Sequence, residues 1–297
     1  MVVIPVEEPR WYNGAEEYRA VQGLVRDGRY REAVERAQHT LLDGYLGRKH
    51  AARLHSQICW LYTDKLHQTC PAAILHGEEA LRLATLVRDQ WIRSEALVRL
   101  IHAYCQVCDL QRARAACTDL AEEIRQNDAA IAGGHAAFLQ LEAMVAAAFG
   151  DEDGCLSTLG LAEDLSDIYP PAVGLRIRLQ RLLTLLDFGR FREARLLLAT
   201  VPQEVDGVEW ALVHAWLAAA EHPGPEAGAM VRAVLTRALE EGNQAAVIHC
   251  VTLQALVTAH TDAGEAQSLA RRAAERATAA GRIDLTRSLR RRLGHLL

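Results

Sequence analysis

Apolar residues recur along the chain at the three- to four-residue spacing of amphipathic helices. In residues 91–107, WIRSEALVRLIHAYCQV, one face carries Ala96, Leu97, Leu100, Ile101 and Tyr104. A short polar segment follows, and helical spacing resumes in residues 112–124, RARAACTDLAEEI. The pattern predicts two helices joined by a tight turn.

The turn between such helices is repeated along the chain. Residues 28–33 read GRYREA and residues 189–194 read GRFREA, while CDLQRA occupies residues 108–113. The small residues that follow each turn are Ala33, Ala73, Ala113, Cys155 and Ala194, spaced 40, 40, 42 and 39 residues apart. A period this regular is typical of stacked helical repeats.

The hexapeptide has a physical role at each turn. Its glycine ends the first helix in the left-handed conformation, which other residues avoid. Its small residue lets the second helix approach the first closely. The aromatic Tyr30 or Phe191 is expected to wedge between repeats.

These motifs resemble the tetratricopeptide repeat (TPR) family over most of residues 15–280. The matching features are Gly-x-Tyr/Phe-x-x-Ala, Tyr104 before its turn, and the small residues Ala37 and Cys117 in second helices. The chain departs from the family in its period, which exceeds the usual ~34 residues. It mostly lacks the Trp and Leu-Gly of the first helix and the closing proline, for which Pro202 is the best candidate. The resemblance implies a binding scaffold, like the sensor domains of some bacterial transcription regulators and peptide-responsive quorum-sensing proteins.

The predicted fold is all-α: a right-handed α-solenoid of about seven helix-turn-helix repeats with a C-terminal closing helix. We divide the chain into an N-terminal segment (1–14), a repeat domain (15–281) and a capping helix (282–297). The expected units are 15–46, 50–88, 90–126, 133–166, 171–203, 207–242 and 245–280. In the sixth, EHPGPEAG at 221–228 predicts a longer loop in place of the tight turn. YPP at 169–171 marks either a subdomain junction or an ordinary repeat boundary.

Composition narrows the function classes. Half of the residues are hydrophobic and only 5% are aromatic. The net charge of −5 argues against non-specific binding to nucleic acid, so no direct nucleic-acid partner is expected. No signal peptide and no 18-residue apolar stretch is recognisable, so no membrane association is expected. Seven scattered cysteines indicate reduced thiols and a cytoplasmic location.

The run HAYCQVC places His102, Cys105 and Cys108 close together and raises zinc or dithiol chemistry as an alternative. A redox C-x-x-C usually begins a helix, whereas this one is expected at a helix C-terminus, where the dipole disfavours thiolate. No second C-x-x-C completes a zinc site, and no enzyme motif is present. We therefore expect neither catalytic residues, nor metal, nor cofactor.

The basic C-terminal run RSLRRRLGHLL has two interpretations. Its arginines, Arg287, Arg290, Arg291 and Arg292, either contact phosphate or an acidic partner, or complement the dipole of the last helix.

The concave surface is the predicted binding site, because first helices line that side of a helical solenoid. Counting from the repeated turns places eight residues there: Arg53, Trp60, His102, Gln106, Gln140, Arg176, Trp210 and Gln254. Amide side chains suit an extended peptide backbone, arginine a carboxylate, and tryptophan an apolar side chain. Some of these residues, the tryptophans above all, are alternatively packing residues between repeats.

The sequence thus predicts a non-enzymatic scaffold whose partner is a protein or peptide segment; a homodimer is possible. The first alternative is a sensor module of a bacterial transcription or quorum-sensing regulator that acts through a separate DNA-binding element. The less favoured alternative is a metal- or thiol-dependent protein that uses the His102, Cys105 and Cys108 cluster.

Overall fold

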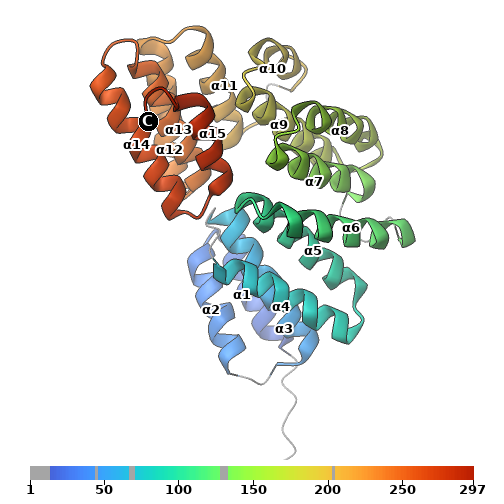
Figure 1. The fold of residues 1–297 in the computed structure, drawn as a ribbon. Helices are drawn as coiled ribbons and strands as arrows, with labels where there is room; N and C mark the ends of the chain where they lie inside the picture. The colour runs from blue at the N-terminus through green and yellow to red at the C-terminus, as the bar shows by residue number, and fades with distance from the viewer. Residues whose placement is uncertain (1–13, 44–45, 67–70, 128–132, 203–204) are drawn as a thin grey trace, which may run out of the picture.

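The computed structural model describes residues 14–43, 46–66, 71–127, 133–202 and 205–297, and their regular secondary structure is entirely helical (Figure 1). The predicted N-terminal segment lies outside these residues except for Gly14. The helices are α1 (Ala15–Arg26), α2 (Tyr30–Leu42), α3 (Arg48–Trp60), α4 (Pro71–Val87), α5 (Gln90–Gln106), α6 (Leu110–Gln126), α7 (Gly134–Phe149), α8 (Glu152–Leu165), α9 (Pro171–Asp187), α10 (Phe191–Leu198), α11 (Val208–Glu221), α12 (Pro225–Glu240), α13 (Gln244–Thr258), α14 (Ala263–Ala279) and α15 (Ile283–Leu293). A π-helical segment, η1 (Leu61–Lys65), extends α3, and a 3₁₀ turn, η3 (Ser166–Ile168), follows α8.

These helices form seven antiparallel pairs, from α1–α2 to α13–α14, and α15 follows as a closing helix. Successive first helices, α1, α3, α5, α7, α9, α11 and α13, contact one another, whereas contacts between successive second helices are sparse at most in the described chain. A stack of pairs bends toward its more closely packed layer, so the first helices form the inner surface. The predicted all-α solenoid is confirmed.

The repeated turn has the same backbone geometry at each occurrence. Gly28 and Gly189 have φ of 73° and 76°, the left-handed region. The next amide closes the turn by donating back into the helix, as Arg190 N does to Leu185 O at 2.8 Å. Cys108 adopts φ of 55° in the equivalent position, so this turn is made without glycine.

The turn also occurs where the hexapeptide comparison did not find it. Gly242 and Gly281, with φ of 70° and 67°, join α12 to α13 and α14 to α15. The same motif therefore connects helices both within and between repeats.

The small residues that define the period are all buried. Ala33, Ala73, Ala113, Cys155 and Ala194 each have 0% exposed surface. They lie in the first turns of α2, α4, α6, α8 and α10, against the preceding first helix. A larger side chain at these positions meets packed atoms.

Two connections between helices can be compared with the boundaries predicted from the sequence. Pro170 caps α9 and Pro171 begins it, and one apolar cluster that includes Tyr169 and Ile177 continues across this junction from α7 to α9. α11 ends at Glu221 and α12 begins at Pro225, so the longer loop predicted for 221–228 is wrong. Proline at the first helical position starts α12 almost at once, because its fixed φ suits that position.

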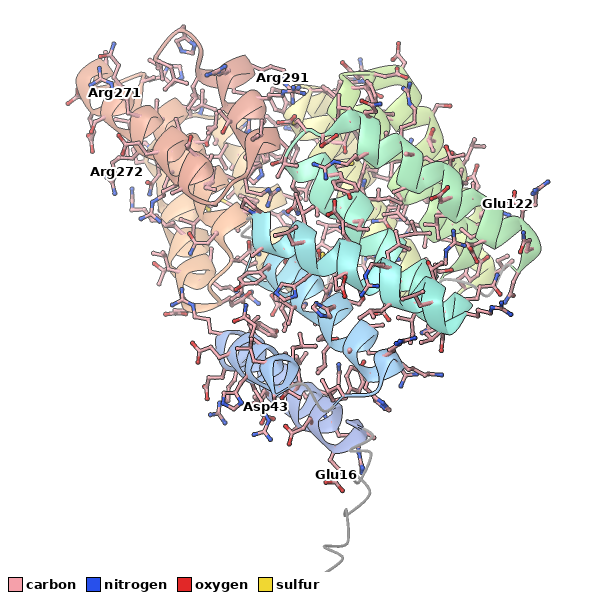
Figure 2. All side chains as sticks on the ribbon, turned by 60° about the horizontal axis from the view of Figure 1, so that its bottom comes forward. Glu16, Asp43, Glu122, Arg271, Arg272 and Arg291 are labelled. Carbon is pink, nitrogen blue, oxygen red and sulfur yellow. The ribbon has the colours of Figure 1, made fainter. Side chains whose placement is uncertain are left out.

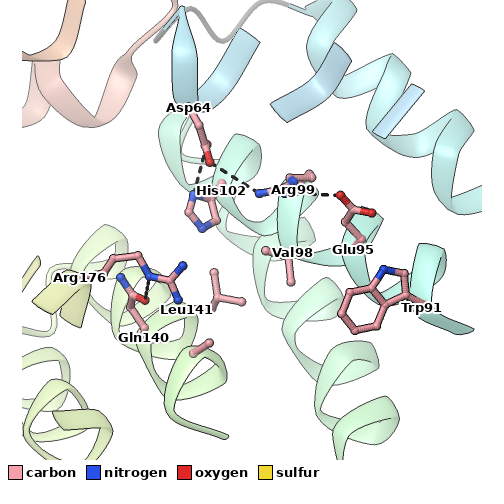
Figure 3. Close-up of a pocket in the computed structure, with 10 residues that line it drawn as sticks. Asp64, Trp91, Glu95, Val98, Arg99, His102, Gln140, Leu141 and Arg176 are labelled. Atoms are coloured by element: carbon pink, nitrogen blue, oxygen red, sulfur yellow. Dashed lines mark hydrogen bonds and ion pairs between the residues drawn. The ribbon is translucent and has the colours of Figure 1, made fainter. Parts of the chain in front are cut away.

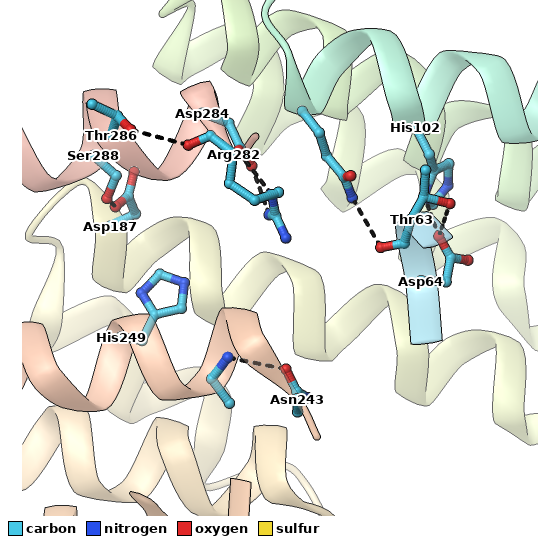
Figure 4. Close-up of polar contacts among 12 residues, drawn as sticks. Thr63, Asp64, His102, Asp187, Asn243, His249, Arg282, Asp284, Thr286 and Ser288 are labelled. Carbon is cyan, nitrogen blue, oxygen red and sulfur yellow. Dashed lines mark hydrogen bonds and ion pairs between the residues drawn. The ribbon is translucent and has the colours of Figure 1, made fainter. Parts of the chain in front are cut away.

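The closing helix α15 turns toward the inner surface rather than only covering the end of the stack (Figure 4). Its apolar side joins the core of α13 and α14 through Leu285 and Leu289. Its polar side binds Asp187 at the end of α9, through Ser288 and Arg291. α15 also contacts α5, and Figure 1 shows the chain curving so that the red α15 returns toward the teal helices. Arg287 donates to the Ala148 carbonyl at 3.3 Å, so the basic run largely makes contacts within the chain.

Charged side chains cover the outer surface. Figure 2 shows Glu16, Asp43, Glu122, Arg271 and Arg272 projecting from the ribbon. None of the described helices combines the length and the apolar character that crossing a membrane requires.

Candidate functional site

A cavity of about 250 Å³ opens on the inner surface between α5 and α7, bordered by η1 and α9 (Figure 3). It lies where three successive first helices run side by side. Its lining residues are Asp64, Trp91, Glu95, Val98, Arg99, His102, Ala137, Gln140, Leu141 and Arg176.

Three residues of the predicted concave set line this cavity together. His102 comes from α5, Gln140 from α7 and Arg176 from α9, at spacings of 38 and 36 residues. Stacked repeats place equivalent positions of successive units beside one another. Counting from the turns therefore placed three of the eight predicted residues on the lining of one cavity.

One end of the cavity contains an acidic and basic network. Arg99 lies between two carboxylates: its Nη1 is 3.7 Å from Asp64 Oδ2 and its Nη2 is 3.5 Å from Glu95 Oε1. His102 Nδ1 is 3.6 Å from Asp64 Oδ1. Burial lowers the pKa of His102, and the Asp64 charge only partly opposes this effect. His102 is therefore a neutral hydrogen-bonding group near neutral pH.

The other end contains a chain of amides that holds an arginine. Gln140 Nε2 donates to Gln180 Oε1 at 2.6 Å, and Arg176 Nε donates to Gln140 Oε1 at 3.1 Å. Gln140 is 9% exposed, whereas Arg176 is solvent-accessible. Partial desolvation by the surrounding protein atoms, then the nearby Arg99 cation, lower the pKa of Arg176, and the Asp64 charge partly opposes them; Arg176 stays charged at neutral pH.

Apolar side chains lie between these two polar ends. Val98, Ala137 and Leu141 line the cavity, and Trp91 stands at its edge with 51% of its surface exposed. An exposed tryptophan beside apolar lining offers contact area that a ligand can cover.

Three other predicted residues lie on the inner layer without lining the cavity. The Arg53 guanidinium is 5.8 Å from the Tyr18 ring centroid. Trp60 adjoins the cavity indirectly, since Arg99 lies 5.4 Å from its ring centroid. Gln106 is buried, and its Nε2 donates to the Thr63 carbonyl at 3.5 Å. Gln106 is one helical turn from His102 on α5, and Thr63 belongs to η1, next to Asp64 (Figure 4).

The last two predicted residues lie in later repeats, away from the cavity. Trp210 is 8% exposed and belongs to the apolar core of α9 to α13. Its remaining surface borders a separate depression with Arg195 and His214. Gln254 is half-buried on α13. The packing interpretation of Trp210 thus describes its surroundings better than the groove interpretation.

Four polar or aromatic lining residues were missed: Asp64, Trp91, Glu95 and Arg99. Glu95, Arg99 and His102 are spaced by four and three residues, so they share one face of α5. That spacing could have placed Glu95 and Arg99 beside the predicted His102. Asp64 gave no such signal, because its position depends on the π-helical segment η1, a type of distortion frequent at functional sites.

The C-x-x-C cysteines have separate surroundings from His102. Cys105 is 4% exposed and packs in one cluster with Cys117, whereas His102 faces Asp64. Burial raises the pKa of Cys105 and Cys108 and raises that of Cys117 to about 12. Among the residues that the structure describes, no three His, Cys, Asp or Glu side chains group together to hold a metal ion.

Comparison with known proteins identifies the fold. No family model and no curated protein matches the sequence. One of the matching solved structures is the crystal structure of a Rap protein complexed with competence and sporulation factor. It aligns with a TM-score of 0.57 and 14% identity over 95% of this chain and 75% of the Rap chain. At this identity the likeness establishes the shared helical-repeat fold.

Proposed function

We propose that this chain is a non-enzymatic, TPR-like scaffold that binds a peptide or protein segment on its concave surface, at the cavity between α5, α7 and α9. The observation that carries the proposal is the convergence of Arg176, the Gln140 amide and Trp91 from three repeats on one cavity. None of these groups forms a nucleophile–base pair, whereas all are suited to hold a ligand.

The size of the cavity favours binding of part of a peptide over binding of a whole drug-sized molecule. Its volume of about 250 Å³ lies just below the ~300–1,000 Å³ of typical small-ligand pockets. It accommodates one side chain or one chain end, while the rest of an extended segment follows the inner layer. Amides such as Gln140 and Gln180 are able to hydrogen-bond a peptide backbone.

The structural comparison supports the same proposal. A Rap protein of similar fold was crystallised with competence and sporulation factor, so this architecture binds a partner factor in that case. A sensor or regulatory module, working with a separate DNA-binding element, is the alternative that this likeness favours. A cytoplasmic location, with thiols kept reduced, fits the buried cysteines Cys59, Cys105, Cys117, Cys155 and Cys250.

A cavity-filling variant tests the proposal. Val98 is half-buried and lines the cavity, so Val98→Trp is expected to fill it without changing any charge. The matched control is Leu196→Trp on α10, where Leu196 is 64% exposed. A random pentapeptide library is selected against the wild-type chain, and enriched peptides are titrated against both variants by calorimetry.

We expect Val98→Trp to weaken binding of the enriched peptides at least tenfold and Leu196→Trp to leave it unchanged. Peptides that bind both variants equally would place the binding surface elsewhere. A library that yields no enriched peptide would contradict peptide binding itself.

A further inference from the structure

We infer that the cavity recognises a carboxylate of the ligand, bound by Arg176, with an apolar side chain beside it over Val98 and Leu141. This inference rests on the proposed function and adds the chemical class of the group that enters the cavity. It follows from the distribution of charge among the lining residues.

The acidic lining residues already have a cation. Asp64 and Glu95 both face Arg99, at 3.7 and 3.5 Å. Arg176, by contrast, has no carboxylate within 4.0 Å among the residues that the structure describes, and its Nε donates to the neutral amide of Gln140. Two carboxylates and two arginines line the cavity, so its charges balance overall, and Arg176 at the α9 end is the lining cation without an ion pair among the described residues.

The other two arginines of α9, unlike Arg176, each have a carboxylate partner. Arg178 Nε binds Glu163 Oε1 at 2.6 Å, and Arg181 Nη1 binds Glu163 Oε2 at 2.9 Å. One carboxylate of α8 thus serves both of them. Arg176 alone among these three turns away from α8 toward the inner surface.

The contacts of Arg176 fix its orientation and leave its donors free. Its Nε binds Gln140, and Gln140 is itself held by Gln180 at 2.6 Å. Figure 3 shows the guanidinium directed into the cavity on the side of Leu141. A guanidinium presents paired N–H groups whose spacing matches the two oxygens of a carboxylate. Because the side chain is already held, an arriving carboxylate orders little that is not ordered before.

The electrostatic surroundings favour an anion there. Nearby protein atoms and then the Arg99 cation lower the pKa of Arg176, and the Asp64 charge only partly opposes them. A carboxylate placed against Arg176 favours its charged form by direct attraction and so offsets both effects.

The surface beside Arg176 is apolar. Val98 and Leu141 line the middle of the cavity, and the half-exposed Trp91 lies beyond them. A hydrocarbon side chain next to the carboxylate covers this surface, whereas a second charge there would lose hydration without a partner.

Two sources supply this chemistry: the C-terminal carboxylate of a peptide, or the side chain of an aspartate or glutamate within it. Three pooled libraries of N-acetylated pentapeptides separate them. The first has free C-termini and no acidic side chain, the second has amidated C-termini and one Asp or Glu, and the third is amidated and acid-free. Each pool is passed over immobilised protein, and retained peptides are quantified by mass spectrometry.

Three variants accompany the wild-type chain. Arg176→Gln removes the cation but retains an amide next to Gln140. Arg176→Lys keeps the charge and loses the paired donors. Arg192→Gln, at an exposed position of α10, is the control for net charge. Thermal melting of each variant establishes that it is folded.

We expect the first or second pool to be retained in preference to the third, and the pool that is retained identifies the source. Arg176→Gln is expected to lower retention roughly tenfold or more, since hydrogen bonds to charged groups are the stronger ones. Retention by Arg176→Lys is expected to lie between that of wild type and that of Arg176→Gln. Retention by Arg192→Gln is expected to equal that of wild type.

Retention of the acid-free pool as well as the others, with no effect of Arg176→Gln, would overturn carboxylate recognition and leave peptide binding intact. Absence of retention for all three pools would overturn both proposals.

Discussion

The inner surface of the solenoid has an open region and a covered region, and each contains an arginine with different surroundings. Near α5, α7 and α9, Arg176 is held by an amide and faces an open cavity. Near α9, α11 and α13, α15 covers the inner surface, and its own Arg292 lies 4.2 Å from the Trp216 ring centroid and 3.4 Å from Asp187. The arginine that α15 brings to the covered region thus has a carboxylate partner within the chain, whereas Arg176 in the open region has none among the described residues.

The largest effect is expected from removing the carboxylate of the covered region, Asp187. Asp187→Ala is expected to destabilise the fold by about 3 kcal/mol, because it leaves the buried Arg292 without its partner. Urea denaturation followed by circular dichroism measures this loss. Asp284→Ala, which removes the partner of Arg282, is a second probe of the same helix. A loss under 1 kcal/mol for Asp187→Ala would show that the cluster does not hold α15.

The scaffold beneath the open region responds to overpacking. Ala113 has 0% exposed surface at the start of α6, so Ala113→Leu is expected to push α6 from α5 and to cost about 1–3 kcal/mol. Peptide binding should fall only as the folded fraction falls, which titrations at two temperatures can separate. A silent Ala113→Leu would show that the buried small residue is not what sets the helix spacing.

Acid should destabilise the fold through half-buried histidines, of which one pair lies between α3 and α4 and another, His249, lies on α13 in the covered region. His55 and His76 lie between α3 and α4 with their Nδ1 atoms 2.7 Å apart. Burial, and then the neighbouring His76, lower the pKa of His55 to about 4; burial lowers the pKa of His249 to about 3. The folded state therefore favours the neutral rings, while the unfolded chain takes up protons below about pH 6.5.

Stability should consequently be complete above pH 6.5 and should decline as pH falls from 6.5 to about 4. Allowing for solvent screening, we expect His55 to contribute on the order of 1–2 kcal/mol of this decline. Denaturation midpoints across this pH range provide the measurement. His55→Gln should flatten the profile; an unchanged slope would assign the decline to other groups.

The smallest effect is expected in the open region itself. Arg176→Ala removes a solvent-accessible side chain that has no carboxylate partner among the described residues, so stability should change by less than about 0.5 kcal/mol. Gln140 differs, because its amide is buried and bonded to Gln180, and its removal should cost about 1 kcal/mol. Unfolding of the Arg176→Ala chain would mean that this arginine supports the fold.

The sequence predicted those features whose cause is local. The turn at Gly28 and Gly189 depends on hydrogen bonds within six residues, so one hexapeptide specifies it. The recurrence of that turn gave the repeat period, and the period predicted that His102, Gln140 and Arg176 lie on the same inner surface. What could not be predicted depends on how helices rotate about their axes. One residue of register turns a side chain by about 100°, which is enough to move Trp210 from the groove into the core.

Other features either lack a recognisable residue pattern or depend on contacts distant in sequence. Asp64 enters the cavity through a π-helical distortion that no residue pattern announces. The turn at Cys108 lacks glycine, so the motif was recognisable there only by its spacing. The inward path of α15 requires Asp187, about a hundred residues earlier, and no periodicity relates the two.

The contact between α15 and α5 has a consequence for folding. In an open stack of repeats each unit touches only its neighbours, so the ends fray and segments unfold almost independently. Here the last helix is tied to the third pair, which makes the array a loop closed by contacts of long sequence separation. Such contacts slow the folding search, because the intervening chain must be ordered before they form. In return, fraying from the C-terminal end must first break the contact with α5, so the middle and the end of the chain unfold together.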